Sequence, residues 1–268
     1  MPSGLYIAAS GMDATVTRQD VIANNLANVS TVGFKKNQAV DIAFPTYLIA
    51  RLHDQKMKVM DGTAELRPNI GFMGGGVIPQ EIATDYSQGS RLDTKNPLDF
   101  ALTGNGYFFS ILSPEGKTLL TRDGSFSLDS NGRLVTQDGL PVLGHNGEIY
   151  IDGSKVTADE EGNITVDDKA LDQLLVVKVQ DENQLYKVGH SLFQATPKNK
   201  IDMAPDNIQV QQGFLEQSNV NSIQEMVNMI EVTRSYDLNA RMVRSYDIIM
   251  NEAATQIGSL QPSGLSLT

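Results

Sequence analysis

The chain has 268 residues, 40% of them hydrophobic, and its 32 acidic and 21 basic residues give a formal net charge of −11. Length and apolar content suffice for a packed core with extensions beyond one average domain. The negative charge argues against a nucleic-acid partner, which would select a basic face. The absence of cysteine excludes disulfides, iron–sulfur clusters and thiolate zinc sites.

The N-terminal segment, residues 1–36, is predicted to form a helix and its exit loop. Few of its residues are charged, and an uncharged polar face suits close packing on several sides. The helix either docks on its own domain or packs against neighbours. Asparagine, serine and glycine between Asn24 and Gly33 end it and turn the chain. Its apolar positions follow a spacing close to the heptad of a coiled coil, namely Leu5, Ala8, Ala9, Met12, Val16, Ile22, Ala23 and Leu26.

No targeting or membrane segment is visible in the sequence. The first basic residue is Arg18, and the apolar stretch at residues 7–9 is too short for the core of a signal peptide. No window approaches the length of a transmembrane span. We therefore expect no cleaved signal peptide and no direct membrane insertion.

Residues 37–80 are predicted to connect the helix to the body of the protein. Pro45 argues against one regular helix through this segment, and the glycines between Gly71 and Gly76 mark a joint. The glycine run lacks the Gly-Lys-Ser/Thr ending of a phosphate loop, so we interpret it as a hinge or turn.

Residues 81–212 have the pattern of a β domain. Phe100 and Leu102 alternate with other residues, as do Tyr107, Phe109 and Ile111. Asn-Gly and Asp-Gly pairs, which favour hairpin turns, recur at short intervals. Many short strands without βαβ alternation predict an antiparallel barrel or sandwich.

The C-terminal segment, residues 213–268, is predicted to contain a second long helix. Ser222 and Glu225 fit a capping box at its start. Its apolar stripe has a spacing near 3.6 residues and comprises Ile223, Val227, Ile230, Leu238, Met242, Ile249, Ala253 and Ile257. The sequence thus predicts an α+β protein. Its N- and C-terminal helices would pair in a coiled-coil-like layer, with a central antiparallel β domain between them in the sequence.

No residue pattern argues for catalysis, a cofactor or a metal. The loop that begins at Asp129 lacks the bidentate glutamate of a calcium loop. A second acidic group could bind a divalent ion weakly, although a solvated hairpin rim is the favoured interpretation; its members are Asp159, Glu160, Glu161, Asp167 and Asp168. We therefore expect no catalytic residues, no cofactor and no bound metal.

Several stretches resemble signatures of the flagellar basal-body rod and hook-basal body protein family. Ala23–Lys35 (ANNLANVSTVGFK) is similar to the N-terminal signature, and Gly213–Val243 to the C-terminal one. Asn96–Phe109 and Leu120–Gly144 are similar to the middle of the family, whereas residues 38–78 and 156–206 depart from the commonest rod pattern. The residues that carry the two terminal signatures are Asn24, Asn25, Leu26, Ala27, Asn28, Thr31, Gly33, Phe34, Ser218, Asn219, Val220 and Asn221.

The resemblance implies a structural subunit of the bacterial flagellar basal-body rod, located in the basal body and spanning the periplasm. The subunit would polymerise helically through its terminal axial helices and form part of the drive shaft and export channel wall. Its implied partners are further copies of itself, other rod and hook proteins, and the flagellar type III export apparatus. Residues 43–45 with Leu48 and Arg51 favour the proximal-rod type over the distal-rod type.

The two apolar stripes supply the expected subunit interface. Its residues are Leu5, Met12, Ile22, Leu26, Ile223, Val227, Ile230, Leu238, Met242 and Ile249. An alternative function is a non-enzymatic β-rich binding or scaffold module on a coiled-coil stalk. A closed dimer or trimer would favour that alternative, whereas an open-ended polymer would favour the rod subunit.

Overall fold

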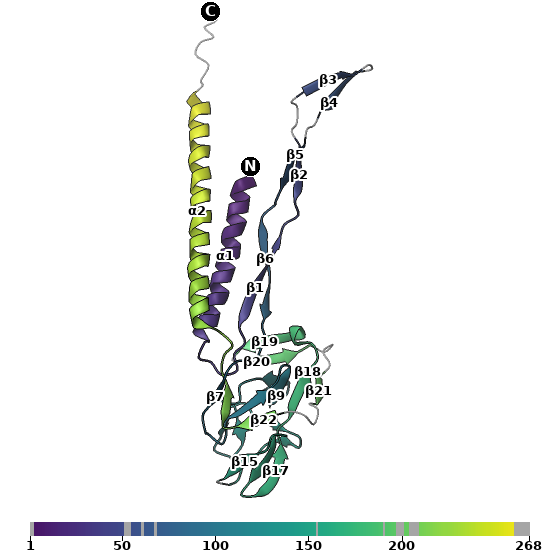
Figure 1. The fold of residues 1–268 in the computed structure, drawn as a ribbon, viewed down its shortest axis with the longest axis vertical. Coiled ribbons are helices and arrows are strands. Elements are labelled where there is room, and N and C mark those ends of the chain that lie inside the picture. The colour runs from purple at the N-terminus through teal and green to yellow at the C-terminus, as the bar shows by residue number, and fades with distance from the viewer. Residues whose placement is uncertain are drawn as a thin grey trace, which may run out of the picture. The chain divides into compact units, whose positions relative to one another are not determined.

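The computed structural model describes residues 3–50, 55–59, 62–66, 69–153, 155–189, 191–196, 201–203 and 209–259. The chain forms two compact units (Figure 1). The helix–ribbon unit draws on Met1–Ile22, Ala39–Ile82 and Val227–Thr268, and the β unit on Ala23–Gln38 and Ala83–Met226. The expected segments 1–36, 37–80, 81–212 and 213–268 follow sequence order, whereas each unit combines stretches that are distant in sequence.

Two long helices, α1 (Ser3–Ala27) and α2 (Ser222–Ser259), confirm the expected helices at both ends of the chain. Within the helix–ribbon unit they lie side by side and run in opposite directions. Gly4 of α1 lies against Tyr246 of α2, and Gly11 lies against Asn239. A Cβ atom at Gly11 would be 2.9 Å from the Asn239 side-chain nitrogen, so the helices approach where α1 carries glycine.

The start of α2 corrects the predicted capping box. Asn221, not Ser222, is the N-cap residue, because its Oδ1 accepts hydrogen bonds from the backbone N–H groups of Ile223 (3.1 Å) and Gln224 (3.2 Å). The backbone N–H of Glu225 donates to the Asn221 carbonyl at 3.0 Å. Asparagine is as good a cap as serine, so this shift by one residue keeps a favourable N-cap.

The described strands between Asn37 and Thr84 pair with one another, which the sequence analysis did not predict. Strand β1 (Asn37–Ala43) pairs with β6 (Val77–Thr84), β2 (Tyr47–Ala50) with β5 (Asn69–Met73), and β3 (Gln55–Val59) with β4 (Gly62–Leu66). The predicted glycine joint at residues 74–76 connects β5 to β6. We call this paired segment the ribbon.

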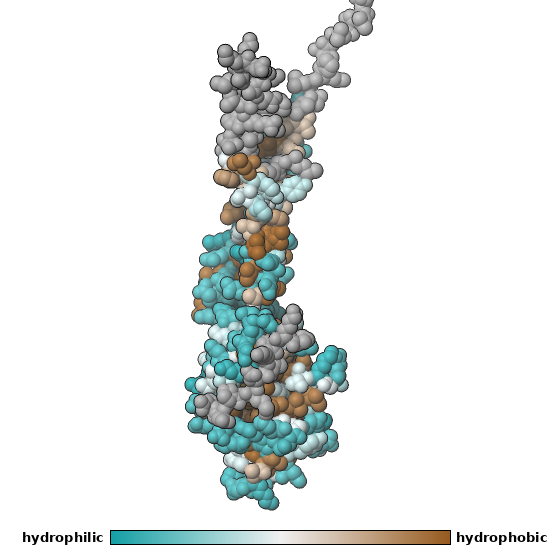
Figure 2. Space-filling view, turned by 90° about the vertical axis from the view of Figure 1, so that its right-hand side faces the viewer, coloured by the Kyte–Doolittle hydropathy of each residue, from teal (hydrophilic) through white to brown (hydrophobic). Residues whose placement is uncertain are grey.

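The ribbon lacks the usual strand pattern because its described residues belong to neither hydrophobic core cluster. In β1, Val40 and Ile42 are exposed, whereas Asp41 is directed inward and forms a salt bridge with Arg18 of α1. The hydroxyl of Ser10 on α1 accepts a hydrogen bond from the backbone N–H of Val77 at 3.2 Å. Figure 2, which faces the ribbon side, shows hydrophobic residues at this surface.

The β unit is built on a six-stranded antiparallel sheet with the order β19-β20-β10-β9-β18-β21. These strands are β9 (Tyr107–Leu112), β10 (Thr118–Thr121), β18 (Val176–Val179), β19 (Leu185–Gly189), β20 (Leu192–Ala195) and β21 (Ile201–Met203). Because β19 and β21 end the sheet on opposite sides, the described strands do not close into a barrel. The β-rich middle is confirmed; of the two predicted architectures, a barrel or a sandwich, the closed barrel is wrong.

Shorter strands complete the β unit. A three-stranded antiparallel sheet contains β15 (Val156–Ala158), β16 (Asn163–Val166) and β17 (Lys169–Gln173). The pairs are β7 (Arg91–Asp93) with β23 (Phe214–Glu216), β8 (Phe100–Thr103) with β22 (Gln209–Gln212), β11 (Ser127–Leu128) with β12 (Leu134–Val135), and β13 (Leu143–Gly144) with β14 (Gly147–Glu148). A 3-10 turn, η1 (Glu182–Gln184), precedes β19.

Strand β9 is buried on both faces and separates two hydrophobic clusters. Phe109 and Ile111 belong to the larger cluster, as their predicted alternation requires. Phe108 points the other way and packs with Leu120 and Phe193 in the smaller cluster. The alternation of Tyr107, Phe109 and Ile111 indicates only one of these faces, and the structure shows that the second face is covered as well.

We expect Phe109→Ala to lower the free energy of unfolding by about 3–5 kcal/mol, because it removes a ring from a closely packed core. Chemical denaturation followed by circular dichroism measures this value. Ile223→Ala is the control, since Ile223 is 74% exposed and its replacement should change stability by less than about 0.5 kcal/mol. Equal effects of the two substitutions would contradict the assigned core.

Candidate functional site

Three of the signature segments meet at one buried ionic cluster in the β unit. Lys35 comes from the N-terminal signature, Arg122 from the middle segment after β10, and Glu216 from β23 in the C-terminal signature. Each residue is only 1% exposed. Lys35 Nζ lies 2.6 Å from Glu216 Oε1, and Arg122 Nη1 lies 2.9 Å from Glu216 Oε2. One carboxylate therefore joins segments that are up to 181 residues apart in sequence.

Backbone groups supply further hydrogen bonds to the cluster, although the buried Nε of Arg122 has no hydrogen-bond partner among the described residues. Glu216 Oε1 also accepts the backbone N–H of Gly89 at 3.0 Å. Lys35 Nζ donates to the carbonyl of Ser87 at 2.8 Å, and the Arg122 guanidinium donates to two carbonyls, those of Leu102 and Gly104. The Arg122 guanidinium also lies 5.4 Å from the centre of the Phe108 ring, which links the cluster to the smaller hydrophobic cluster.

Burial disfavours the charged forms of the two cations in this cluster. It lowers the pKa of Lys35, and Glu216 opposes the shift. Burial likewise lowers the pKa of Arg122, again opposed by Glu216. Glu182, in η1, acts on both cations from a distance, while burial raises its own pKa. Two buried cations thus depend on Glu216 as their only directly bonded carboxylate among the described residues.

In the two terminal signatures, asparagine side chains form hydrogen bonds that join separate stretches of backbone. Asn25 is buried and pairs with Asn37 through two hydrogen bonds of 2.8 Å, one to its carbonyl and one from its N–H. Asn219 accepts the backbone N–H of Lys36 at 2.8 Å and donates to the carbonyl of Asp85 at 2.9 Å. These side chains satisfy backbone groups that have no strand partner in the tight loops around the cluster.

Gly33 is needed where the N-terminal signature passes the cluster. Its φ of +65° lies in the left-handed region that favours glycine. A Cβ atom there would be 2.6 Å from the carbonyl carbon of Arg122. Its N–H donates to the carbonyl of Glu216 at 2.8 Å, so the three segments touch through backbone as well as side chains.

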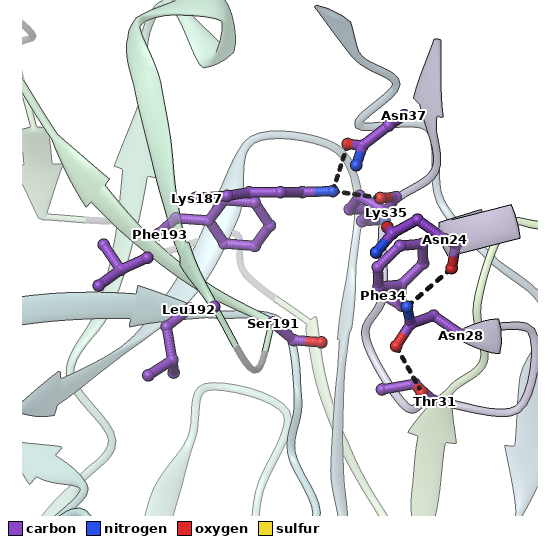
Figure 3. Close-up of a pocket in the computed structure, with 12 residues that line it drawn as sticks. Asn24, Asn28, Thr31, Phe34, Lys35, Asn37, Lys187, Ser191, Leu192 and Phe193 are labelled. Carbon is purple, nitrogen blue, oxygen red and sulfur yellow. Dashed lines mark hydrogen bonds between the residues drawn. The ribbon is translucent and has the colours of Figure 1, made fainter. Parts of the chain in front are cut away.

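A cleft of about 610 Å³ adjoins the cluster (Figure 3). The residues after α1 form one wall and the β19–β20 hairpin forms the other. Its lining combines amides and hydroxyls with aromatic and aliphatic side chains: Asn24, Asn28, Thr31, Phe34, Lys35, Asn37, Lys187, Val188, Gly189, Ser191, Leu192 and Phe193. Signature residues on the first wall hold one another, since Asn28 donates to the Asn24 carbonyl at 2.8 Å and Thr31 donates to Asn28 at 3.2 Å.

Lys187 extends across this cleft. Figure 3 shows its amine directed toward Asn37 Oδ1 at 2.6 Å and the Lys35 carbonyl at 2.5 Å. The amine also lies 4.6 Å from the centre of the Phe34 ring, a cation–π contact. Burial lowers the pKa of Lys187 to about 8, and no described carboxylate forms an ion pair with it.

The predicted interface residues fall into two classes. On α1, Ile22 is buried within the chain, and Leu5, Met12 and Leu26 are half-buried. On α2, all six are exposed: Ile223, Val227, Ile230, Leu238, Met242 and Ile249. The helices thus leave one apolar stripe of α2 uncovered.

Sequence reasoning missed the ionic cluster and Lys187. The local trace of the cluster was a charged residue directly after uncharged ones: Lys35 after Gly-Phe, Arg122 after Leu-Thr, and Glu216 after Phe-Leu. Lys187 carried no comparable signal, because an alternating surface strand often contains lysine.

No group of three or more potential metal ligands occurs among the residues that the structure describes. At the loop that was compared with a calcium site, Asp129 instead binds Arg133 Nε at 2.9 Å and the backbone N–H of Asn131 at 2.6 Å. The helices in the described part of the chain contain no stretch long and apolar enough to span a membrane.

Three family descriptions match the chain in the order of its signatures. Residues 5–35 match "Flagella basal body rod protein", residues 101–182 match "Flagellar hook protein FlgE/F/G D1 domain", and residues 211–257 match "Flagellar basal body rod FlgEFG protein C-terminal". The chain is also 34% identical over 267 residues to the flagellar basal-body rod protein FlgG of Buchnera aphidicola, an alignment that covers 94% of this chain and 98% of the relative. The chain belongs to the flagellar basal-body rod protein family.

Other relatives of this rod protein carry different names. It is 33% identical over 276 residues to the flagellar hook-basal body complex protein FlhO of Bacillus subtilis, with 97% of this chain and 100% of the relative covered. It is 30% identical over 264 residues to the flagellar basal-body rod protein FlgF of Mesorhizobium japonicum, with 97% and 99% covered. The rod protein is therefore a structural protein of the flagellar basal body.

We expect Glu216→Gln to lower the free energy of unfolding by about 3–5 kcal/mol, because two buried cations lose their shared counter-charge. Denaturant titration measures the loss. Glu115→Gln is the matched control, since the Glu115–Lys117 pair is solvent-exposed and should contribute nothing measurable. A Glu216→Gln protein as stable as the control would show that the cluster does not hold the three segments together.

Stability should also depend on pH through Lys187. Its pKa in the folded protein is about 8, against an ordinary 10.5, so the unfolded chain binds more protons between these values and stability rises with pH there. Denaturation of the unmodified protein and of Lys187→Met at pH 7.5 to 10.5 isolates this effect. The unmodified protein should gain stability relative to the variant across the interval, and parallel curves would contradict the shift.

Proposed function

We propose that this rod protein polymerises helically through its terminal helices, forming part of the drive shaft and of the export channel wall. The observation that carries the proposal is the uncovered apolar stripe of α2. Ile223 is 74% exposed, Leu238 62% and Ile249 59%. An exposed apolar stripe along a helix that already has a neighbour in its own chain favours a second partner.

The burial pattern of α2 supports two distinct faces. Half-buried residues recur at alternating steps of three and four, namely Met229, Val232, Tyr236, Asn239, Val243 and Tyr246. Asn239 and Tyr246 are the side chains that contact α1, so this face is used within the chain. The apolar stripe lies on the other side of the helix, because its members are offset from this series and exposed.

Burial of this stripe between copies would supply the free energy of assembly. Complete burial of one isoleucine or leucine side chain contributes about 1.5–3 kcal/mol, and the stripe repeats in every subunit. A contact between different surfaces of successive copies generates a helical filament when its rotation does not close into a ring. The stalked-module alternative requires a closed oligomer, for which family membership offers no support.

Further parts of the proposal concern place and partners. We propose assembly with other rod and hook proteins, export through the flagellar type III apparatus, and a non-enzymatic role. Relatives named FlgG and FlgF match over similar lengths, so the preference for the proximal rod still depends on residues 43–45, Leu48 and Arg51. Of these, Arg51 lies outside the described residues. Electron microscopy of basal bodies that lack this chain would give its position in the rod.

We expect Ile230→Asp to abolish incorporation into the rod while leaving the monomer folded. Ile230 is 53% exposed in the chain, so aspartate is solvated there, whereas burial between copies would desolvate an unpaired carboxylate. Motility and electron microscopy of basal bodies report assembly, and circular dichroism reports folding. Ile230→Leu, which keeps the site apolar, should assemble normally. Normal rods with Ile230→Asp would show that this stripe is not a subunit contact.

A further inference from the structure

The cleft of the β unit holds a cation without an anionic partner. Lys187 donates two hydrogen bonds to neutral oxygens, and its pKa is lowered by burial alone. Folding of the isolated chain has therefore already removed this amine from part of its water. A carboxylate that entered the cleft would gain a charge-assisted hydrogen bond against that reduced desolvation cost.

The rest of the cleft suits a short turn of polypeptide. Asn24, Asn28, Thr31 and Ser191 present amides and hydroxyls that can bind backbone N–H and C=O groups, while Leu192 provides an apolar surface. The volume of about 610 Å³ lies within the range of sites that accept small ligands. The side chain of Val188, which also lines the cleft, is 54% exposed, so the cleft opens to solvent.

An acidic turn lies at the far end of the same unit. Asp159, Glu160 and Glu161 form the turn between β15 and β16, which the sequence analysis singled out as an acidic rim. Figure 1 shows the β15–β17 sheet at the end of the β unit opposite to the β19–β20 hairpin, and Figure 2 shows that end as predominantly hydrophilic.

Hydrogen bonds hold the turn, and one of its carboxylates has no bonded partner among the described residues. Asp159 accepts the backbone N–H groups of Glu161 (3.1 Å) and Asn163 (2.8 Å), which holds the turn. The backbone carbonyl of Glu160 accepts the N–H of Val210 at 2.8 Å, whereas the exposed Glu160 side chain has no bonded partner among the described residues. Glu160 is thus presented outward from a fixed backbone.

We propose that the acidic turn of one copy docks in the cleft of the next, with the Glu160 carboxylate accepting a hydrogen bond from Lys187 Nζ. This inference rests on the proposed polymerisation and names a contact between its β units. Two complementary surfaces at opposite ends of one unit form a heterologous contact, which each added copy regenerates for the next. Because the chain carries a net charge of −11, copies repel at long range, and a local opposite-charge pair selects one docking orientation.

Disulfide trapping tests the contact directly, because the natural chain has no cysteine. Val188→Cys places a thiol on the cleft wall, and Glu161→Cys places one beside Glu160; both sites are exposed and leave Lys187 and Glu160 intact. A protein with both substitutions should, after oxidation of assembled basal bodies, give a ladder of dimers, trimers and larger species on a non-reducing gel. Addition of Lys187→Met to this double variant should reduce the ladder strongly.

Matched controls separate this proposal from polymerisation itself. Each single-cysteine variant, and the pair Val188→Cys with Glu115→Cys, should give no ladder, since Glu115 is an exposed acid on a different turn. If the double variant assembles into rods but gives no ladder, or if the Glu115 control gives the same ladder, the cleft contact is refuted while polymerisation stands. If Ile230→Asp assembles normally as well, the proposed helical interface fails separately.

Discussion

Glu216 holds two cations that no other described carboxylate binds directly, and this arrangement constrains the whole β unit. Lys35, Arg122 and Glu216 are each 1% exposed, so any arrangement that separates them leaves a charge unpaired inside the protein. A buried ion pair adds little net stability over good apolar packing, whereas breaking one is strongly unfavourable. The cluster therefore acts mainly by selecting one mutual position for three distant segments.

The mutual position of these three segments also sets where α1 ends and where α2 begins. Lys35 follows α1 after a short loop, and Glu216 precedes α2 by a few residues. The surrounding signature residues serve the same purpose: Gly33 permits close approach of backbone, Asn25 and Asn219 satisfy backbone groups, and Asn221 caps α2. These residues pack within the chain, while the exposed stripe of α2 is left for neighbouring subunits under our proposal.

Recognition between copies then requires surfaces that are neither buried nor paired when a single chain folds. In α2 the contact with α1 uses Asn239 and Tyr246 against glycines, while the exposed apolar stripe lies on the opposite side. In the β unit, Lys187 donates only to neutral oxygens, and the exposed Glu160 side chain has no bonded partner in the part of the chain that the structure describes. The helical stripe would supply hydrophobic free energy, and the charged pair would supply orientation.

The sequence by itself determined the two terminal helices, the β-rich middle and the family, because these depend on periodicity, on turn residues and on linear signatures. Tertiary structure alone decided the rest. The ribbon was not predicted because its apolar residues face outward and its inward side meets α1 through Ser10 and Arg18. The ionic cluster was not predicted because Lys35 and Glu216 are far apart in sequence, and nothing in their local surroundings indicates which opposite charge each will meet. Burial of β9 on both faces and the choice of Asn221 over Ser222 as the cap likewise depend on what packs nearby, a property that no single segment encodes.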